Sequence, residues 1–350
     1  MPSIKDVARL AGVSVMTASR VINVSGAVAP HTKSKVMRAV NELGYRPNLT
    51  ARSLRMRRSE LFGLLLPDIE NPVFASLAKY VEEAAHGYGY SVMLGNTWED
   101  PEREAKHFEL MMARRMDGII MSPVSSANED LIRNSVAPVV LLDRSLDHSP
   151  SPSVRVDGRE VGRLAARHLA SLGHEHFGCI SGPLHIDLFA ERVEGFREEL
   201  SRAGMRVDCM VSADAISRIE SGEKFGGELL RKCRVRPLAV FCANDITAFG
   251  AMLAAKRRGL AVPEDVAFVG VDDISFCEMA LPTLTTVRQP FREIAATAVR
   301  LLIEMLKNRD CKPENMMLKP ELVVRESTAG VVRVKAGGGK AAAAKAGAGA

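Results

Sequence analysis

From residue 61 onwards, short apolar runs of strand length alternate with amphipathic stretches that are long enough to form helices. This alternation is typical of βαβ units, in which crossover helices join parallel strands that are buried on both faces. It predicts a doubly wound α/β domain over residues 59–330. The strands are expected at residues 61–66, 91–94, 118–121, 139–142, 177–180, 238–242 and 266–271.

The first 46 residues carry a different pattern, that of three short helices. Ser3 and Asp6 have the spacing of a capping box at the start of the first helix. Ser14 can cap the second helix, and Pro30 begins a third, which ends at Gly44. The pattern predicts a small all-α helix-turn-helix domain, although a generic three-helix bundle is an alternative for this segment alone.

Lys and Arg are concentrated at the N-terminal end of the chain. Residues 1–58 hold eleven of them against two acidic residues, whereas residues 59–330 hold 32 against 40. A basic segment ahead of a mildly acidic body is typical of a nucleic-acid reader joined to a domain of another kind. Charge alone also fits a merely solvated basic face.

In a helix-turn-helix, the N-terminal end of the second helix enters the major groove of DNA. The residues there are Val15, Met16 and Arg20. Arg20 can donate two parallel hydrogen bonds to guanine, and the two apolar side chains suit thymine methyl groups or cytosine edges. Hydroxyl and amide groups around the same helix suit phosphate oxygens, which fix the register. These groups belong to Ser14, Thr17, Ser19, Asn23 and Ser25.

Four motifs together closely resemble those of the LacI/GalR family of bacterial repressors. They are IKDVARLAGVS at residues 4–14, SRVIN at 19–23, ELGYRPN at 42–48 and ARSLR at 51–55. The resemblance runs from about Ser3 to Ser327. It implies a sequence-specific DNA-binding transcriptional regulator, expected to be a repressor, that binds double-stranded, pseudo-palindromic operator DNA as a dimer and responds to a small sugar.

The resemblance also implies a hinge helix within a linker at residues 47–58. In the family, the leucine at the position of Leu54 enters a central minor-groove step of the operator. Asn48 can cap such a helix, and Ala51 is small enough for a partner helix to approach closely. Arg52 and Arg55 would contact phosphates. A plain basic linker is the alternative.

Polar residues follow the predicted strands, at the edge where open α/β sheets bind ligands. They are Asn96, Ser122, Asp143, Arg144, Ser181, Asn244, Asp245, Asp272 and Asp273. Such short acceptors and guanidinium groups together fit a polyhydroxylated ligand. Each residue taken alone could equally be the N-cap of the helix that follows its strand.

The resemblance implies a periplasmic-binding-protein-like domain, with two lobes that close over an effector and chain crossings near residues 160 and 289. Carried over motif by motif, the effector site comprises Asn71, Phe74, Asp143, Arg144, Arg192, Asn244, Asp272 and Gln289. Phe74 would stack on a sugar face, and the balance of aspartates and arginines favours a neutral sugar. Where purine-responsive members carry an additional arginine, this chain has Ile186, which disfavours a purine. Leu188 offers an apolar surface on the same loop.

Catalysis is not predicted. The chain lacks the G-x-S-x-G, G-x-x-x-x-G-K-[ST], G-x-G-x-x-G and H-E-x-x-H motifs. No catalytic residue, metal or cofactor is therefore expected, and His174 and His176 are interpreted as loop residues rather than metal ligands. The alternatives from other classes are an α/β enzyme and a sugar-binding protein without a DNA role.

The ends of the chain and its cysteines add expectations about compartment and assembly. No apolar run approaches the roughly 18 residues of a membrane helix, and no apolar signal segment begins the sequence, so a cytoplasmic protein without membrane contact is expected. The six cysteines form no C-x-x-C pair, which disfavours disulfides and zinc. No leucine heptad follows Arg325, which favours a homodimer. Residues 331–350 are rich in Ala, Gly and Lys and are expected to be disordered.

Overall fold

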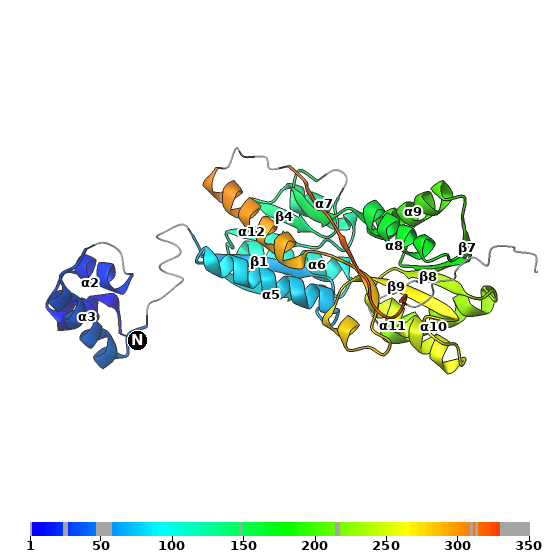
Figure 1. Cartoon of the computed structure of the whole chain (residues 1–350). Helices are drawn as coiled ribbons and strands as arrows, with labels where there is room; N and C mark the ends of the chain where they lie inside the picture. The colour runs from blue at the N-terminus through cyan, green and yellow to red at the C-terminus, as the bar shows by residue number, and fades with distance from the viewer. Residues whose placement is uncertain are drawn as a thin grey trace, which may run out of the picture. The chain divides into compact units, whose positions relative to one another are not determined.

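The computed structural model describes residues 2–23, 27–46, 58–146, 149–213, 218–308, 311 and 314–329. The chain divides into two compact units, with the boundary between Glu60 and Leu61 (Figure 1). Of the predicted hinge at residues 47–58, residues 47–57 lie outside the described residues, as does the predicted disordered tail at residues 331–350. The same holds for the predicted DNA contacts Ser25, Asn48, Ala51, Arg52, Leu54 and Arg55.

The N-terminal unit consists of α1 (Ile4–Ala11), α2 (Val15–Ile22) and α3 (Pro30–Leu43). Its core is small and is made of Val and Ala side chains, whose small size lets the three helices approach one another closely. The buried members are Val7, Ala8, Ala11, Ala18, Val21, Val36 and Ala39. Ile22, Val40 and Leu43 are partly buried against this core.

The ends of these helices form as the sequence predicts. The main-chain N–H and the hydroxyl of Ser3 both donate to the Asp6 carboxylate, at 2.9 and 2.7 Å. Gly12 and Gly44 follow α1 and α3 with φ angles of 65° and 56°, a left-handed conformation that side chains other than glycine rarely adopt. These caps fix the two turns, so the helices begin and end at defined residues.

The larger unit contains two six-stranded sheets. In the first sheet the strand order is β11-β5-β4-β3-β1-β2, and every neighbouring pair is parallel. The strands are β1 (Leu61–Leu66), β2 (Ser91–Asn96), β3 (Gly118–Met121), β4 (Val139–Leu142), β5 (Ser153–Val156) and β11 (Met316–Leu318). The helices α5 (Pro72–Gly87) and α12 (Phe291–Lys307) pack side by side on one face, and α6 (Pro101–Ala113) packs against β1 from the other. The short η1 (Ser126–Asn128) and α7 (Glu129–Arg133) join β3 to β4.

The second sheet has the order β12-β10-β9-β8-β6-β7, and only β10 and β12 pair antiparallel within it. Its strands are β6 (Phe177–Ser181), β7 (Val207–Ser212), β8 (Leu238–Cys242), β9 (Val266–Asp272), β10 (Thr285–Arg288) and β12 (Glu321–Val323). Two pairs of helices pack together, α8 (Gly158–Ser171) with α9 (Asp187–Arg202) and α10 (Ile219–Lys232) with α11 (Asp245–Arg257). The short η2 (Ser275–Glu278) follows β9.

The predicted fold class, a helical domain followed by a two-lobed α/β domain, is confirmed, and all seven predicted strands are present. Three of them, β2, β6 and β9, extend one or two residues beyond their predicted ends. The strands β5, β7, β10, β11 and β12 were not predicted. They are only three to six residues long, and polar residues interrupt most of them, so no continuous apolar run marks them in the sequence.

The chain passes between the two sheets three times. The first passage leads from β5 through α8 to β6, the second from β10 to α12, and the third from β11 to β12. The sequence analysis placed two passages, near residues 160 and 289, and did not anticipate the third. Because β11 and β12 have only three residues each, the third passage has little sequence signal of its own.

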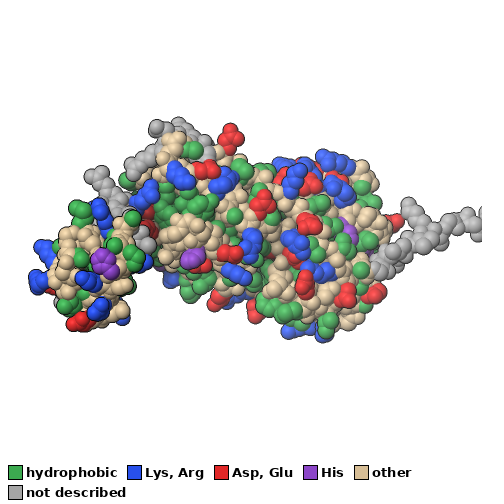
Figure 2. Space-filling view, turned by 60° about the vertical axis from the view of Figure 1, so that its left-hand side comes forward, with side chains coloured by type: hydrophobic (Ala, Val, Ile, Leu, Met, Phe, Trp, Pro, Cys, Tyr) green, Lys and Arg blue, Asp and Glu red, His purple; other side chains and the backbone are tan. Residues whose placement is uncertain are grey.

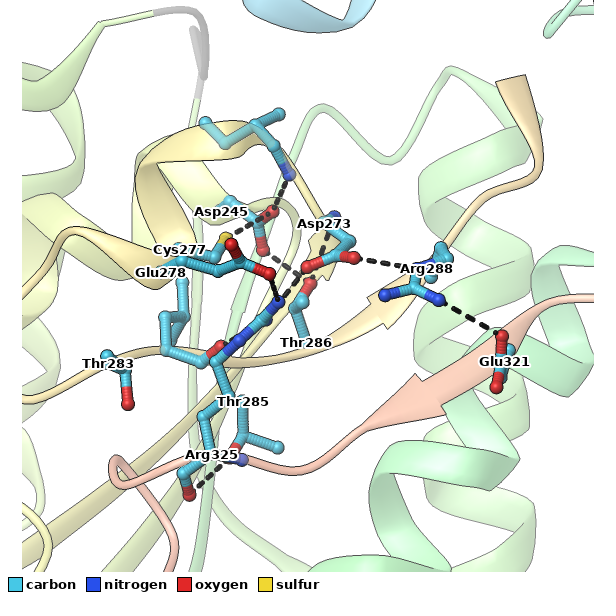
Figure 3. A network of polar contacts seen from close by, with 12 residues as sticks. Asp245, Asp273, Cys277, Glu278, Thr283, Thr285, Thr286, Arg288, Glu321 and Arg325 are labelled. Carbon is cyan, nitrogen blue, oxygen red and sulfur yellow. Dashed lines mark hydrogen bonds and ion pairs between the residues drawn. The ribbon is translucent and has the colours of Figure 1, made fainter. Parts of the chain in front are cut away.

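A buried polar network secures the segment that follows β9 (Figure 3). The Asp245 carboxylate, which is fully buried, accepts hydrogen bonds from the Thr286 hydroxyl at 2.6 Å, the Ile274 main-chain N–H at 3.0 Å and the Cys277 thiol at 3.1 Å. Burial raises the pKa of Asp245 to about 6, although these hydrogen bonds oppose the rise. Asp245 therefore serves to hold the β9–β10 connection in place.

Two arginines extend this network to the third passage. Arg288 contacts the Asp273 carboxylate at 2.7 Å and the Glu321 carboxylate at 3.4 Å, as Figure 3 shows. Arg325 contacts Asp273 at 2.8 Å and Glu278 at 3.2 Å. The strands β10 and β12 are thus joined both by their antiparallel pairing and by charged side chains.

The helices α8 and α9 approach each other so closely that a side chain cannot fit at two positions. A Cβ at Gly162 would collide with the main-chain carbonyl of Arg192 and the main-chain N–H of Phe196. A Cβ at Gly195 would collide with the main-chain carbonyl of Arg159. These glycines set the position of α9, and therefore that of Arg192, relative to the first passage.

We predict that Gly162→Ala destabilises the α/β unit by about 1–3 kcal/mol, because the added methyl group must push two main chains apart. Urea unfolding measures the change as a lower midpoint. Gly87→Ala is the matched control, because Gly87 is also a helix residue, the last one of α5, but has open space where its Cβ would lie. If both variants unfold at the wild-type urea concentration, the close packing of α8 on α9 does not constrain the fold.

Candidate functional site

A cleft of about 370 Å³ lies between the carboxyl ends of the strands of the two sheets. From the first sheet, the segments after β1, β2, β3 and β4 line it, and from the second sheet the segments after β6, β8, β9 and β10 do so. All eight residues predicted for the effector site line this one cleft. They are Asn71, Phe74, Asp143, Arg144, Arg192, Asn244, Asp272 and Gln289.

The guanidinium of Arg192 is the central charged group on the wall formed by the second sheet. Arg192 is 3% exposed and donates to the main-chain carbonyl of Ala243 at 2.6 Å. Its Nη2 lies 4.0 Å from the Asp272 carboxylate, and Asp272 accepts a hydrogen bond from the Gln289 amide at 2.6 Å. Among the described residues, the buried Nε of Arg192 has no hydrogen-bond partner, which leaves a donor for a ligand.

Burial raises the pKa of two aspartates of the cleft, Asp143 and Asp272. Burial raises the pKa of Asp272 well above its usual range, and the charge of Arg192 opposes this only in part. Burial likewise raises the pKa of Asp143, against the opposing charges of Arg192 and Arg144. Since Asp143 follows a strand of the first sheet and Arg192 belongs to a helix of the second, their interaction spans the cleft.

Arg144 is held in place on the wall formed by the first sheet. Its two terminal nitrogens donate to the two carboxylate oxygens of Glu99, at 3.0 and 2.8 Å, and one also donates to the Pro123 carbonyl at 3.3 Å. A bidentate pair of this kind fixes the plane of the guanidinium. Arg144 therefore forms a rigid part of the wall.

Two of the predicted residues are also helix N-caps. Asn71 accepts from the Val73 main-chain N–H at 3.1 Å at the start of α5, and Asn244 accepts from that of Thr247 at 2.8 Å at the start of α11. For Asn244 the alternative interpretation as a cap is thus correct. A cap does not exclude a ligand role, since the side chains of Asn71 and Asn244 both also line the cleft.

The remaining wall is largely apolar. Phe74 is joined by three side chains from the beginning of α9, namely Ile186, Leu188 and Phe189. The Arg192 guanidinium lies 5.6 Å from the centre of the Phe189 ring, within the range of a cation–π contact. The cleft therefore pairs an apolar surface with a cluster of hydrogen-bonding groups, as small-molecule sites commonly do.

The sequence analysis missed two acidic residues of the cleft, Asp68 and Glu99. Both lie two or three residues beyond the end of a strand, so the rule that located Asp143 could have found them. With them, four carboxyl groups face two guanidinium groups, and the predicted balance of charge does not hold. Ser125, His185 and Phe189 also line the cleft and were not predicted.

Five residues of the predicted strand-end ring do not line the cleft: Asn96, Ser122, Ser181, Asp245 and Asp273. Asp245 and Asp273 belong instead to the network of Figure 3. The Ser181 hydroxyl donates to the carbonyl of Gly182 at 3.0 Å. Position at a strand end is therefore insufficient to place a residue in the cleft, because adjacent residues point in different directions.

On the N-terminal unit, α2 presents the predicted base-reading residues to the surface. Met16 is 64% exposed and Val15 43% exposed, and Arg20 is also exposed. Figure 2 shows that Lys and Arg side chains are spread over this unit, with few acidic ones on the visible face.

The polar residues of the same helix already have partners within it. The Ser14 hydroxyl accepts from the Thr17 main-chain N–H at 3.1 Å and lies 2.9 Å from the Thr17 hydroxyl. The Asn23 side chain donates to the carbonyl of Ser19 at 2.8 Å and to its hydroxyl at 3.1 Å. These contacts hold both ends of α2, so any phosphate contact from these four residues would be additional to a capping role.

Among the described residues, no three His, Cys, Asp or Glu side chains are grouped so as to hold a metal ion. His174 is buried, and His176 Nδ1 lies 3.3 Å from the Asp208 carboxylate. No helix in the described part of the chain is both long and apolar enough to span a membrane.

Comparison with known proteins agrees with the two-part organisation. The chain matches the model of the lacI family of bacterial regulatory proteins over residues 3–48 and that of the periplasmic binding protein-like domain over residues 166–328. The HTH-type transcriptional regulator DegA of Bacillus subtilis is 36% identical over 331 residues, which cover 93% of this chain and 98% of DegA.

Solved structures extend the similarity to both units. The Lac repressor dimer bound to operator and the anti-inducer ONPF has a TM-score of 0.83 and 30% identity, covering 93% of this chain and 99% of that one. The complex of the transcriptional regulator CelR with cellobiose has a TM-score of 0.71 and 30% identity, covering 93% and 100%. These relatives are transcriptional regulators rather than enzymes. The chain thus belongs to the LacI family of bacterial regulatory proteins and is a DNA-binding transcriptional regulator.

Proposed function

We propose that this regulator is a repressor that binds a pseudo-palindromic operator as a homodimer and releases or tightens on it when a neutral sugar enters the cleft. The observation that carries the proposal is the convergence of eight separately predicted residues on one cleft, in a chain that also has a helix-turn-helix unit. The similarity to a Lac repressor dimer bound to operator supports the dimer and the operator.

On DNA, the exposed end of α2 would enter the major groove. Arg20 would read a guanine through two hydrogen bonds, while Val15 and Met16 would contact thymine methyl groups or cytosine edges. The capping residues Ser14 and Asn23 would hold the helix at the angle that these contacts need. The entry of Leu54 of the hinge into the minor groove stays a prediction, since Leu54 lies outside the described residues.

In the cleft, a polyhydroxylated ligand would meet both kinds of surface that it needs. Its hydroxyl groups would donate to Asp143 and Asp272 and accept from Arg192, including the buried Nε. The C–H face of a sugar ring would pack on Phe74 or Phe189. Because acidic groups outnumber guanidiniums there, an anionic effector such as a sugar acid is disfavoured.

A two-stage measurement tests the proposal. A thermal-shift screen over common pentoses, hexoses and disaccharides should identify a sugar that raises the melting temperature, because a ligand of the folded state stabilises it by mass action. That sugar should then change the affinity for a fragment of the DNA upstream of the protein's own coding region. A sugar that binds without changing operator affinity would contradict the proposed control.

We predict that Arg20→Ala relaxes base preference at one operator position and costs about 1–3 kcal/mol of binding there, because two hydrogen bonds to a base are lost. Binding to a set of single-base operator variants measures this. Lys35→Ala, which removes an exposed basic side chain from α3, is the control and should leave base preference unaltered. Unchanged discrimination in the Arg20 variant would show that another residue reads that base.

We predict that Arg192→Ala abolishes the response to the sugar and that Asp272→Asn weakens it, while operator affinity without sugar stays within a few-fold of wild type. Both side chains face the cleft, and neither belongs to the DNA-reading unit. Titration of the operator complex with the sugar measures the response. Asp265→Asn is the control, because Asp265 is a half-buried carboxylate outside the cleft that caps its own loop.

The raised pKa values of the cleft predict a pH dependence of sugar binding. Because burial raises the pKa of Asp272, and less strongly that of Asp143, their protonation begins nearer neutral pH than for ordinary carboxyl groups. A protonated carboxyl accepts fewer hydrogen bonds, so sugar affinity should fall as the pH is lowered from neutrality. The fall should be smaller in Asp272→Asn. Equal pH profiles in the two proteins would exclude Asp272 as the titrating acceptor.

A further inference from the structure

The cleft does not end at the residues predicted for the effector. A second cavity of about 340 Å³ adjoins it and shares seven of its wall residues: Val124, Ser125, Asp143, Arg144, His185, Ile186 and Leu188. The second cavity extends towards the β4–β5 side of the first sheet, where β5 contributes Arg155. The two cavities are therefore adjoining compartments of one cleft, with Arg144 and Ile186 at their junction.

Two residues at that junction are held in place. Arg144 is fixed by its bidentate contact with Glu99, and Ile186 is the N-cap residue of α9. Neither group can move far without breaking a hydrogen-bonded pair or unwinding a helix end. A ligand confined to the first compartment would leave the second filled with water.

The walls of the second compartment carry hydrogen-bonding groups rather than a continuous apolar surface. Those found only there include the hydroxyls of Ser126 and Ser145, the carboxylate of Asp187 and the guanidinium of Arg155. Arg155 is itself oriented by a 2.8 Å contact with Glu191, so its position is set before a ligand arrives. Leu146 adds an apolar patch beside these groups.

This combination of hydroxyl, carboxylate and guanidinium groups with a small apolar patch matches the needs of a second sugar ring. Pockets for small ligands commonly measure about 300–1,000 Å³, and the first compartment alone lies at the lower end of that range. An aromatic or alkyl substituent would instead leave the polar groups of the second compartment without partners, which is costly.

Resting on the proposed function, we infer that the effector is a disaccharide or longer oligosaccharide. One ring binds among Asp143, Arg192 and Asp272, and the next occupies the compartment lined by Ser126, Ser145 and Arg155. The glycosidic link lies at the junction formed by Arg144 and Ile186. The second compartment is then a specificity site that selects the length of the sugar.

Isothermal titration of the full-length protein tests this with glucose, galactose and xylose against cellobiose, maltose, lactose and xylobiose. At least one disaccharide should bind about tenfold or more tightly than its constituent monosaccharides. Ser145→Phe, which fills the second compartment, should remove that advantage while leaving monosaccharide affinity unchanged. Ser126→Phe, on an exposed turn, is a second variant should Ser145→Phe fail to fold.

Ala296→Phe is the matched control, because Ala296 is an exposed residue of α12 that lines a separate hollow beside Tyr80. It should leave both classes of sugar unaffected. Monosaccharides that bind as tightly as every disaccharide would overturn the inference and leave the proposed function intact. An unchanged disaccharide affinity in the folded Phe variants would overturn it as well. If no sugar of either size bound, the proposed sugar control would itself fail, and this inference with it.

Discussion

The buried guanidinium of Arg192 is the interaction on which the geometry of the cleft depends. It joins three separate parts of the chain, because it bonds to the carbonyl that follows β8, faces the carboxylate that ends β9, and opposes across the cleft the carboxyl that follows β4. A buried charge is tolerated only where such partners compensate for the loss of water. Conversely, without Arg192 two buried carboxyl groups would lose their compensating charge. The positive charge and its partners therefore stabilise one another, and the fold supplies the surroundings that keep them together.

The main chain at the same place is held in conformations that are unfavourable in isolation. Asp143 and Asp272 have φ angles of 61° and 117°, in a region where residues other than glycine cost about 1–3 kcal/mol. Such strain persists only when the surroundings impose it. Here the hydrogen bond from Gln289 holds the side chain of Asp272, and the close backbone contacts at Gly162 and Gly195 hold α9 against α8. The cleft is thus arranged before a ligand enters, which lowers the entropy that binding must cost.

The sequence was most informative where one physical signal is strong over several residues. Continuous apolar runs located the central strands, the caps Ser3 and Ser14 located the first two helices, and the strand-end rule located Asp143 and Asp272. Residues such as Arg192 and Gln289 depended on the family resemblance, since neither directly follows a predicted strand. The edge strands β7 and β12 were not predicted, because half-exposed strands lack a continuous apolar run. Only the structure shows that Asp272 lines the cleft and that Asp273 does not, because the orientation of successive side chains at a strand end depends on local φ and ψ.

The distribution of the cleft groups over two sheets decides whether a ligand can act as a signal. A ligand shifts a conformational equilibrium only by the difference in its affinity for the two states. If every contacting group came from one sheet, a change in the angle between the sheets would leave all contacts intact, and the ligand would bind both states equally. Here Asp143 and Arg144 follow strands of the first sheet, while Arg192 and Asp272 belong to the second. A molecule that reaches groups of both sheets must lose some contacts whenever the sheets move apart, and that loss is the free energy available for control of DNA binding.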